Sequence, residues 1–184
     1  MLSATLNKNP MKINMKSNVI IRPYSEEWPH LFEKIRQELL TAFSPDSTQI
    51  EHIGSTAVVG LCAKPVIDVL LGTNSLNEIE SQITSLDTLG FGYVSKYEQD
   101  IPTRRYFVKS SSDSLRIHVH GVEIGSRIWC EHLKFRDLLR TDAQLRSEYQ
   151  QLKLRLAAQY ADDKSAYTDA KEPFIKSVLE KIRR

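Results

Sequence analysis

Cysteine is scarce in this sequence: Cys62 and Cys130 are the only two among 184 residues. They do not form the closely spaced pairs of a zinc site, and two cysteines cannot supply the disulfide framework of a small secreted protein. Free thiols suit a reducing compartment. The sequence therefore predicts a cytoplasmic protein.

Long hydrophobic runs are also missing. Nowhere do the 18 or more consecutive apolar residues of a membrane-spanning helix occur. Residues 1–17 carry scattered lysines and asparagines and lack the apolar segment of a signal peptide. We expect no membrane partner, a loose tail over residues 1–17 and a single domain over residues 18–184.

Neither sign of charge dominates, because the formal net charge is only +2. Residues 126–184 are mildly basic, with 13 Lys and Arg against 9 Asp and Glu. That excess suits a phosphate-bearing ligand and equally suits a solvated helical surface. It is small for a nucleic-acid-binding protein, so an RNA-associated role is the least favoured function.

The spacing of apolar residues predicts an α+β protein. Three- and four-residue spacing predicts helices, alternation predicts strands, and the two patterns are interleaved as far as residue 125. From Ser126 onward only helical spacing remains, which predicts a helical C-terminal part over about 126–184, with caps at 141–142 and 162–163. The expected helices are 25–43, 76–89, 126–140, 142–160 and 163–184; the expected strands are 18–24, 48–53, 65–72, 104–110 and 115–123.

The segment EHIGSTAVVGLCAKPVIDVLL, residues 51–71, contains the first candidate site. Gly54 and Ser55 follow a strand and open a short helix, where backbone N–H groups and the Ser55 and Thr56 hydroxyls can bind an anion. Asp68 lies inside the next, otherwise apolar strand, and a buried carboxylate needs a partner. A divalent metal held against a phosphate is one interpretation; a tight turn, with Asp68 paired to Lys64 or an arginine, is the other.

These residues resemble a known family. The Gly-Ser turn followed about a dozen residues later by a strand carrying aspartate is similar to the signature of the nucleotidyltransferase fold. The wider stretch IEHIGSTAVVGLCAKPVIDVLL, with HLKFRDLLR, YQQLKLRLA and YTDAKEPFI further on, resembles the GrpB family over roughly residues 19–182. The resemblance implies a nucleotidyltransferase-like mixed sheet flanked by helices.

One departure from active nucleotidyltransferases concerns the metal ligands. Those enzymes usually carry a second carboxylate two positions after the first, and this chain has Leu70 there. A full two-metal mechanism therefore does not follow from the resemblance.

The strand RIHVHG offers further candidate ligands, because Arg116, His118 and His120 alternate and share one face. A histidine can bind a metal or act as an acid or base; the resemblance implies that a histidine of this strand, His118 above all, lines the pocket. The same pattern also fits an exposed polar edge. On the partner strand, Arg105 and Lys109 are candidate phosphate ligands, although such residues also protect sheet edges.

Three functions follow from these candidates. The first is a transferase using Mg²⁺ or another divalent metal to move a nucleotidyl or phosphoryl group from a nucleoside triphosphate to a small acceptor. Its expected catalytic residues are Asp68, His118 and His120, its metal ligands Asp68 and His118, and its phosphate ligands Gly54, Ser55, Thr56, Lys64, Arg105 and Lys109. The second is a nucleotide-binding module without catalysis; the RNA-associated role is the third.

Overall fold

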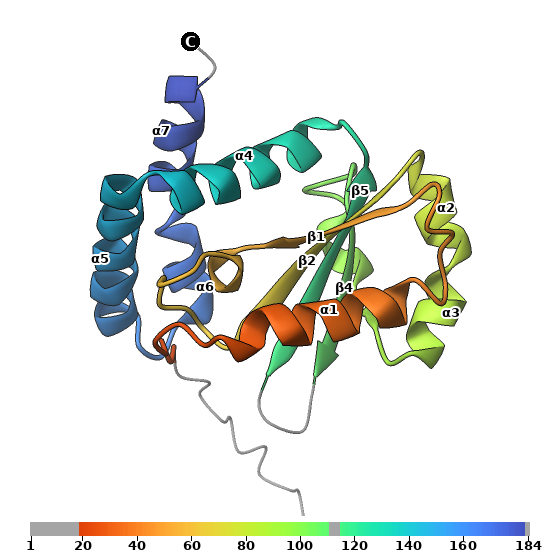
Figure 1. Cartoon of the computed structure of the whole chain (residues 1–184), viewed down its shortest axis with the longest axis horizontal. Coiled ribbons are helices and arrows are strands. Elements are labelled where there is room, and N and C mark those ends of the chain that lie inside the picture. The colour runs from red at the N-terminus through yellow and green to blue at the C-terminus, as the bar shows by residue number, and fades with distance from the viewer. Residues whose placement is uncertain (1–18, 111–114, 183–184) are drawn as a thin grey trace, which may run out of the picture.

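The computed structural model of the chain describes residues 19–110 and 115–182. The tail expected over residues 1–17 and the turn expected between the hairpin strands lie outside the described residues. Within these residues, five strands form one mixed sheet in the order β1-β2-β5-β4-β3 (Figure 1). The strands are β1 Gln49–Ile53, β2 Val66–Thr73, β3 Gly92–Tyr93, β4 Arg105–Ser110 and β5 Arg116–Glu123.

The register at the centre of the sheet decides which side chains become neighbours. Strands β2 and β5 are parallel, with Asp68 opposite His118 and Leu70 opposite His120. Strand β4 pairs with β5 in the antiparallel sense and places Tyr106 opposite His120. Since paired residues point to the same face of a sheet, these five side chains share one face.

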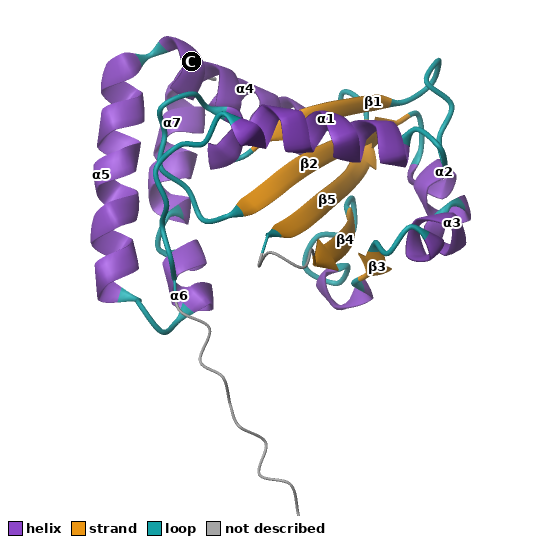
Figure 2. Cartoon of the chain, turned by 60° about the horizontal axis from the view of Figure 1, so that its bottom comes forward, coloured by secondary structure: helices purple, strands orange, loops and turns teal. Residues whose placement is uncertain are grey.

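The opposite face of the sheet holds the largest core. Its central residues include Ile67, Val69, Phe107, Ile117 and Val119, all buried. They pack against α1 (Glu27–Leu39), α2 (Leu76–Ser81) and α3 (Ile83–Thr88). Figure 2 shows α1 lying across the sheet; α2 packs near the ends of β2 and β5, and α3 lies beside β3.

The face that carries Asp68 is covered at one end by α4 (Arg127–Thr141). Trp129 of this helix packs with Ile53, Leu70 and Val122 in a smaller core. The remaining helices, α5 (Ala143–Gln159), α6 (Lys164–Asp169) and α7 (Glu172–Ile182), stand together at the side of the sheet (Figure 2).

The helix caps expected from the sequence are present. The Asp142 side chain accepts a hydrogen bond from the Leu145 N–H, and the Asp163 side chain accepts one from the Ala166 N–H. Each carboxylate satisfies one of the backbone donors left free at a helix start. These caps fix where α5 and α6 begin.

Three expected elements differ in the structure. Residues 18–24 do not form a strand in their described part, which contains an isolated bridge between Arg22 and Ala63. The helix expected over 76–89 is divided at Gln82, whose φ and ψ of −102° and 5° are not helical. The last helix is divided near Lys171, because Pro173 lacks an N–H and is tolerated only in the first turn of a new helix.

None of the described helices combines the length and the hydropathy that a membrane span requires.

Candidate functional site

The Gly54 turn and Asp68 lie in direct contact. Gly54 has a φ of 71°, a conformation that L side chains rarely adopt. A Cβ at this position would also lie 3.1 Å from Asp68 Cγ and overlap Oδ2. The turn therefore needs glycine both for its backbone angle and for the approach of the carboxylate.

We predict that Gly54→Ala destabilises the protein by about 1–3 kcal/mol, because a side chain in this strained backbone region meets the carboxylate. Chemical denaturation measures the change. Gly60→Ala is the matched control, since Gly60 also has a positive φ but a Cβ added there would meet no atom within 4 Å. Equal losses in both variants would mean that backbone strain alone, and not contact with Asp68, requires glycine at position 54.

Two histidines of strand β5 flank Asp68. His118 Nδ1 lies 3.4 Å and His120 Nε2 lies 3.8 Å from Asp68 Oδ1. Burial by itself would raise the pKa of the Asp68 carboxyl, but hydrogen bonding and charge from the two histidines outweigh it and hold that pKa well below its usual range. Asp68 is therefore a carboxylate at neutral pH, and its side chain remains 29% exposed.

The histidine group extends beyond β5. The Tyr106 ring lies 5.2 Å from the His120 ring, and the His132 ring, from α4, lies 5.6 Å from it on centroid distances. Burial lowers the pKa of His120, against the pull of Asp68, and burial followed by the charge of His120 lowers the pKa of His132 to about 4. Among the described residues His120 Nδ1 is buried without a hydrogen-bond partner. Because their pKa values are lowered, the His120 and His132 rings are neutral at pH 7.

Three lysines also interact with the charge of Asp68. Lys153 of α5 donates a hydrogen bond to the Cys62 carbonyl oxygen, while Lys64 and Lys171 lie 4.9 Å and 4.5 Å from the centre of the Tyr167 ring. In the described part of the chain, none of the three forms an ion pair with a carboxylate within 4.0 Å. We call Lys64, Lys153 and Lys171 the lysine cluster.

All three amines of the lysine cluster have lowered pKa values. Burial, with added repulsion from the other lysines of the cluster, lowers the pKa of Lys153 to about 7 and that of Lys171 to about 8. Burial also lowers the pKa of Lys64, and the charge of Asp68 opposes the shift in all three. Tyr149 connects the cluster to the turn, because Lys153 Nζ lies 5.3 Å from the centre of its ring and the Ser55 side chain interacts with it. An anion placed beside Ser55 would relieve this repulsion.

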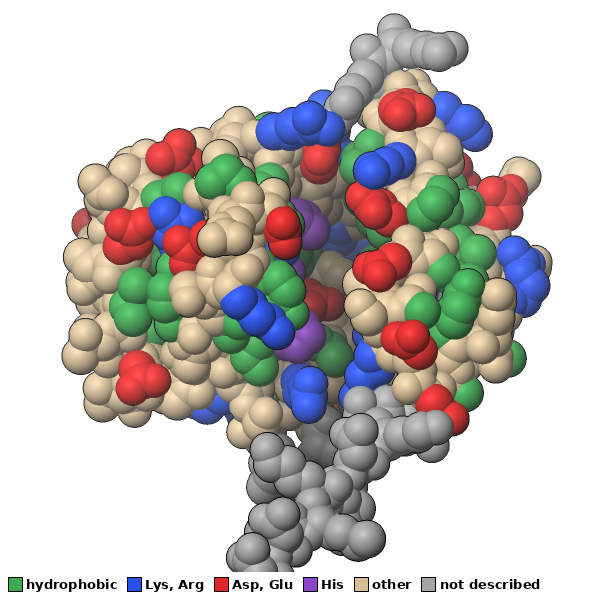
Figure 3. Space-filling model, turned by 180° about the vertical axis from the view of Figure 1, so that it is seen from behind, with side chains coloured by type: hydrophobic (Ala, Val, Ile, Leu, Met, Phe, Trp, Pro, Cys, Tyr) green, Lys and Arg blue, Asp and Glu red, His purple; other side chains and the backbone are tan. Residues whose placement is uncertain are grey.

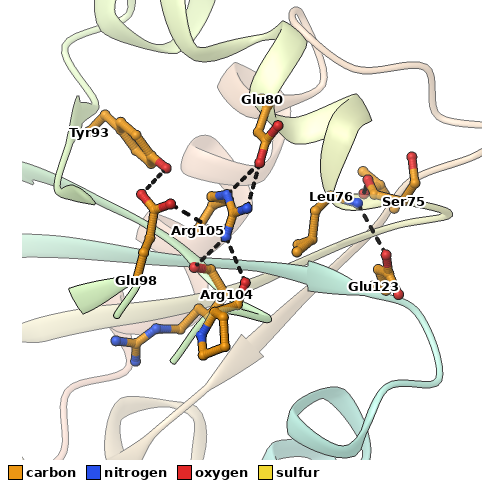
Figure 4. Close-up of polar contacts among 10 residues, drawn as sticks. Ser75, Leu76, Glu80, Tyr93, Glu98, Arg104, Arg105 and Glu123 are labelled. Carbon is orange, nitrogen blue, oxygen red and sulfur yellow. Dashed lines mark hydrogen bonds and ion pairs between the residues drawn. The ribbon is translucent and has the colours of Figure 1, made fainter. Parts of the chain in front are cut away.

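Three residues expected to bind phosphate are engaged elsewhere. Arg105 and Lys109 project from the opposite face of the sheet to Asp68; Arg105 pairs with Glu80 and Glu98, and Lys109 pairs with Glu38. Figure 4 shows the Arg105 side chain turned toward Glu80 and Glu98, whereas the Arg104 side chain leaves the strand on the other side.

Thr56 is the third. It is 1% exposed, and its hydroxyl donates to the Val66 carbonyl oxygen and accepts from His52. The short helix that begins at Ser55 has only three residues, Ser55–Ala57, so it has no appreciable dipole for an anion. Positive charge at the turn comes from the lysine cluster instead, and Lys153 and Lys171 were not predicted as ligands.

Leu70 stands where a second carboxylate would bind metal, and it is completely buried against Ile53, Val122 and Trp129. In residues 19–110 and 115–182, no three His, Cys, Asp or Glu side chains are grouped so that they could hold a metal ion. Mg²⁺ is commonly held by one or two carboxylates together with substrate phosphates and waters. Asp68 therefore fits an ion that arrives with a phosphate ligand, and the residues do not form a complete metal cage.

Figure 3 shows one face of the molecule, on which histidine, acidic and basic side chains gather in a hollow between two halves. Asp68 contacts His118 and His120, and its charge also acts on the three lysines of the lysine cluster. A carboxylate, imidazoles and lysines without carboxylate partners can together bind a phosphorylated compound and exchange a proton with it.

Comparison with solved structures identifies the fold. GrpB of Enterococcus faecalis superposes with a TM-score of 0.79 at 29% identity, covering 88% of this chain and 96% of that one. A cytoplasmic RNA terminal U-transferase superposes with a TM-score of 0.51 at 15% identity, covering 71% of this chain and 41% of that one. The second likeness concerns the fold alone. The predicted α+β, nucleotidyltransferase-like mixed sheet flanked by helices is confirmed.

Comparison with curated sequences identifies the family. UPF0157 protein YqkA of Bacillus subtilis is 36% identical over 169 residues, which are 92% of this chain and 48% of that protein. Glutamate-rich protein GrpB of Alkalihalophilus pseudofirmus is 33% identical over 171 residues, 91% of this chain and 97% of that protein. The chain thus spans about half of the first relative and nearly all of the second. Because the model of the family described as GrpB protein also matches residues 18–181, this chain belongs to the GrpB family.

Proposed function

We propose that this chain binds the magnesium complex of a nucleoside triphosphate and transfers a nucleotidyl or phosphoryl group from it to a small acceptor. The observation that carries the proposal is the lysine cluster, in which Lys153 is buried and Lys64 and Lys171 are partly buried, and which has no carboxylate partner within 4.0 Å among the described residues. Burying unpaired charge is costly, and a polyphosphate of opposite charge would offset that cost.

Each part of the site has a role in this proposal. The Ser55 hydroxyl donates a hydrogen bond to a phosphate, and the lysine cluster neutralises the phosphate chain. Asp68 supplies the protein ligand to the magnesium ion, which would withdraw charge from the phosphate oxygens. Ser55, Lys64 and Asp68 lie in β2 or in the segment before it, whereas Lys153 belongs to α5 and Lys171 lies between α6 and α7.

His118 is the proposed general base. Its Nδ1 lies 3.4 Å from Asp68 and its side chain is 25% exposed, so a ring with its proton on Nδ1 has its lone pair on Nε2. Nε2 would take the proton of the acceptor hydroxyl as its oxygen attacks phosphorus. Pyrophosphate leaves if the α-phosphorus is attacked, and nucleoside diphosphate leaves if the γ-phosphorus is attacked.

A binding function without catalysis is the second candidate, and burial of Leu70 favours it. With Asp68 as the one carboxylate on this face of β2, the protein supplies fewer metal ligands than a two-metal transferase uses. The lysine cluster and Ser55 serve both candidates equally. Turnover, rather than affinity, separates them.

The deciding experiment incubates the purified protein with each nucleoside triphosphate, magnesium and a pool of metabolites, and measures released pyrophosphate and nucleoside diphosphate. Magnesium-dependent release would support the transferase. Tight binding with no release under any acceptor pool would favour the binding module. If neither triphosphate nor pyrophosphate raises the melting temperature, both candidates are wrong, because a ligand that binds only the native state must stabilise it.

We predict that Ser55→Ala weakens pyrophosphate binding by about 1 to 2 kcal/mol, the range of a single hydrogen bond to a charged group. Isothermal titration calorimetry measures the affinity. Ser85→Ala is the matched control, because Ser85 is an exposed serine of α3 whose hydroxyl donates to Gln82. Unchanged affinity in Ser55→Ala would remove the Ser55 hydroxyl from the proposed site.

A further inference from the structure

A second hollow lies along the outer edge of β1, and the proposed nucleotide site does not use it. Its volume is about 620 Å³, inside the range of roughly 300–1,000 Å³ that is usual for small-molecule sites. Asp68, Ser55 and the lysine cluster are not among the residues that line it. Figure 1 shows α1 and α4 on opposite sides of β1, and residues of both helices form its walls.

Three arginines from α4 and α5 give this hollow an excess of positive charge. Arg136 donates to Glu51 at 2.6 Å and to Asp137 at 2.8 Å, and Arg140 shares Asp137 at 3.5 Å. Arg146 donates to two backbone carbonyl oxygens and, within the described residues, forms no ion pair with a carboxylate. Three guanidinium groups therefore face two carboxylates.

The arginines are positioned without using all of their hydrogen-bond donors. Arg140 Nε donates to the Ala57 carbonyl oxygen, and Arg146 Nη1 donates to the carbonyl oxygens of Leu139 and Arg140. A guanidinium carries five N–H donors in a rigid fork. These backbone contacts fix the groups at the hollow and leave donors for a phosphate or carboxylate.

The rest of the lining is apolar or aromatic. Phe32 stacks on His52 with ring centres 4.7 Å apart and planes 7° from parallel, and Tyr24 lies in the same wall. Val59 lines the hollow although 71% of it is exposed. A purely inorganic anion would leave these surfaces unused, whereas a ligand with an apolar part would cover them.

We infer that this hollow is a second ligand site, for a small organic anion that carries a phosphate or carboxylate group on an apolar body. The inference does not depend on nucleotide binding at Ser55, because no lining residue is shared with that site.

The test uses phenyl phosphate and benzoate as probes, with inorganic phosphate for comparison, and follows the methyl NMR signals of Ala57 and Val59 in the full chain. We expect at least one organic anion to shift both signals and to bind about tenfold more tightly than inorganic phosphate, a difference of about 1.4 kcal/mol. A response to phenyl phosphate alone would indicate a phosphate ligand, and a response to benzoate alone would indicate a carboxylate ligand. If neither probe shifts these methyl signals, the hollow is not a ligand site.

The exposed rim offers a matched pair of variants. Val59→Glu places a negative charge at the solvated mouth and should weaken probe binding by about fivefold or more, through repulsion between like charges. Val59→Gln has nearly the same shape without the charge and should stay within about threefold of wild type by the same reasoning. In these two variants binding is followed on the Ala57 methyl. Equal losses in both would overturn the electrostatic argument.

The arginines offer a second pair. Arg146→Gln should weaken binding by about tenfold or more, the usual consequence of losing a charged donor. Arg155→Gln, an exposed arginine further along α5, should not change it. Lys153→Met, in the lysine cluster, should leave the shifts of Ala57 and Val59 intact; if it abolishes them, the probe binds at the lysine cluster and the second site is wrong.

Discussion

Replacing Lys153 by methionine is expected to stabilise the protein and to weaken pyrophosphate binding by about tenfold or more. Lys153 is 2% exposed, and burial lowers the pKa of its amine to about 7. The folded state therefore carries the cost of a charge that methionine does not have. Loss of the hydrogen bond to the Cys62 carbonyl opposes the gain by about 1 kcal/mol.

Two measurements separate this expectation from a structural role. Thermal melting at pH 6, where the amine is charged, should give a higher midpoint for Lys153→Met than for wild type, while calorimetry should give weaker pyrophosphate binding. Lys34→Met is the control, because Lys34 is an exposed lysine of α1. A variant that melts lower and binds pyrophosphate like wild type would make Lys153 a structural lysine.

The same pKa value gives the direction of the pH dependence. Between pH 7 and about pH 10 the unfolded chain holds a proton on Lys153 that the folded chain has lost, so the free energy of unfolding contributed by this residue rises with pH. Below pH 7 both states are protonated and the contribution is constant. The rise should be smaller in Lys153→Met, where Lys171, with a pKa of about 8, still contributes.

Ligand binding should reverse the shift in pKa. A bound anion favours the charged form of Lys153 and of Lys171, whose pKa is about 8, so pyrophosphate binding at pH 8 should take up protons. Calorimetry in two buffers of different ionisation enthalpy measures the uptake, and Lys153→Met should reduce it. Equal uptake in both proteins would place the pyrophosphate away from Lys153.

The central part of the site could be predicted from the sequence because it depends on local alternation. Asp68 in β2 and the two histidines of β5 each follow a period of two, which fixes the face on which they lie. The parallel pairing of β2 with β5 then makes Asp68 and His118 direct neighbours. This pairing was not predicted, because a strand pattern does not name its partner strand.

The same alternation explains why Arg105 and Lys109 lie away from Asp68 and the Gly54 turn. They lie two residues before and after Phe107, which is completely buried against the core under α1, so all three point to that face. Tyr106, one residue away, points to Asp68 instead. The buried aromatic ring of Phe107 therefore indicates the face on which Arg105 and Lys109 lie.

Two members of the lysine cluster, Lys153 and Lys171, were not predicted because they come from distant segments of the chain. Lys153 lies 98 positions after Ser55 and Lys171 lies 116 positions after it, and no local pattern reports such a distance. A weaker signal did exist in α5. Tyr149, Lys153 and Leu156 lie at the spacing of one helix face, and all three are buried. A lysine inside an apolar helix face needs a buried partner or a ligand.

Replacing Asp68 by asparagine is expected to change pyrophosphate binding in opposite directions with and without magnesium. Asp68 is a carboxylate whose charge acts on all three lysines of the cluster, so it also repels a phosphate bound there. Asparagine keeps the shape and removes the charge. Without magnesium the variant should therefore bind pyrophosphate more tightly than wild type.

With magnesium the order should reverse, because Asp68 is the proposed protein ligand of an ion that the pyrophosphate brings with it. Wild type should gain affinity on addition of magnesium, and Asp68→Asn should lose about tenfold relative to wild type under the same conditions. Asp87→Asn, on the exposed surface of α3, is the control and should follow wild type in both conditions. The proposal fails if Asp68→Asn does not fold, or if magnesium changes its affinity for pyrophosphate as much as it changes that of wild type. Asp68 would then be a structural partner of His118 and His120, and the chain would have no metal-dependent step.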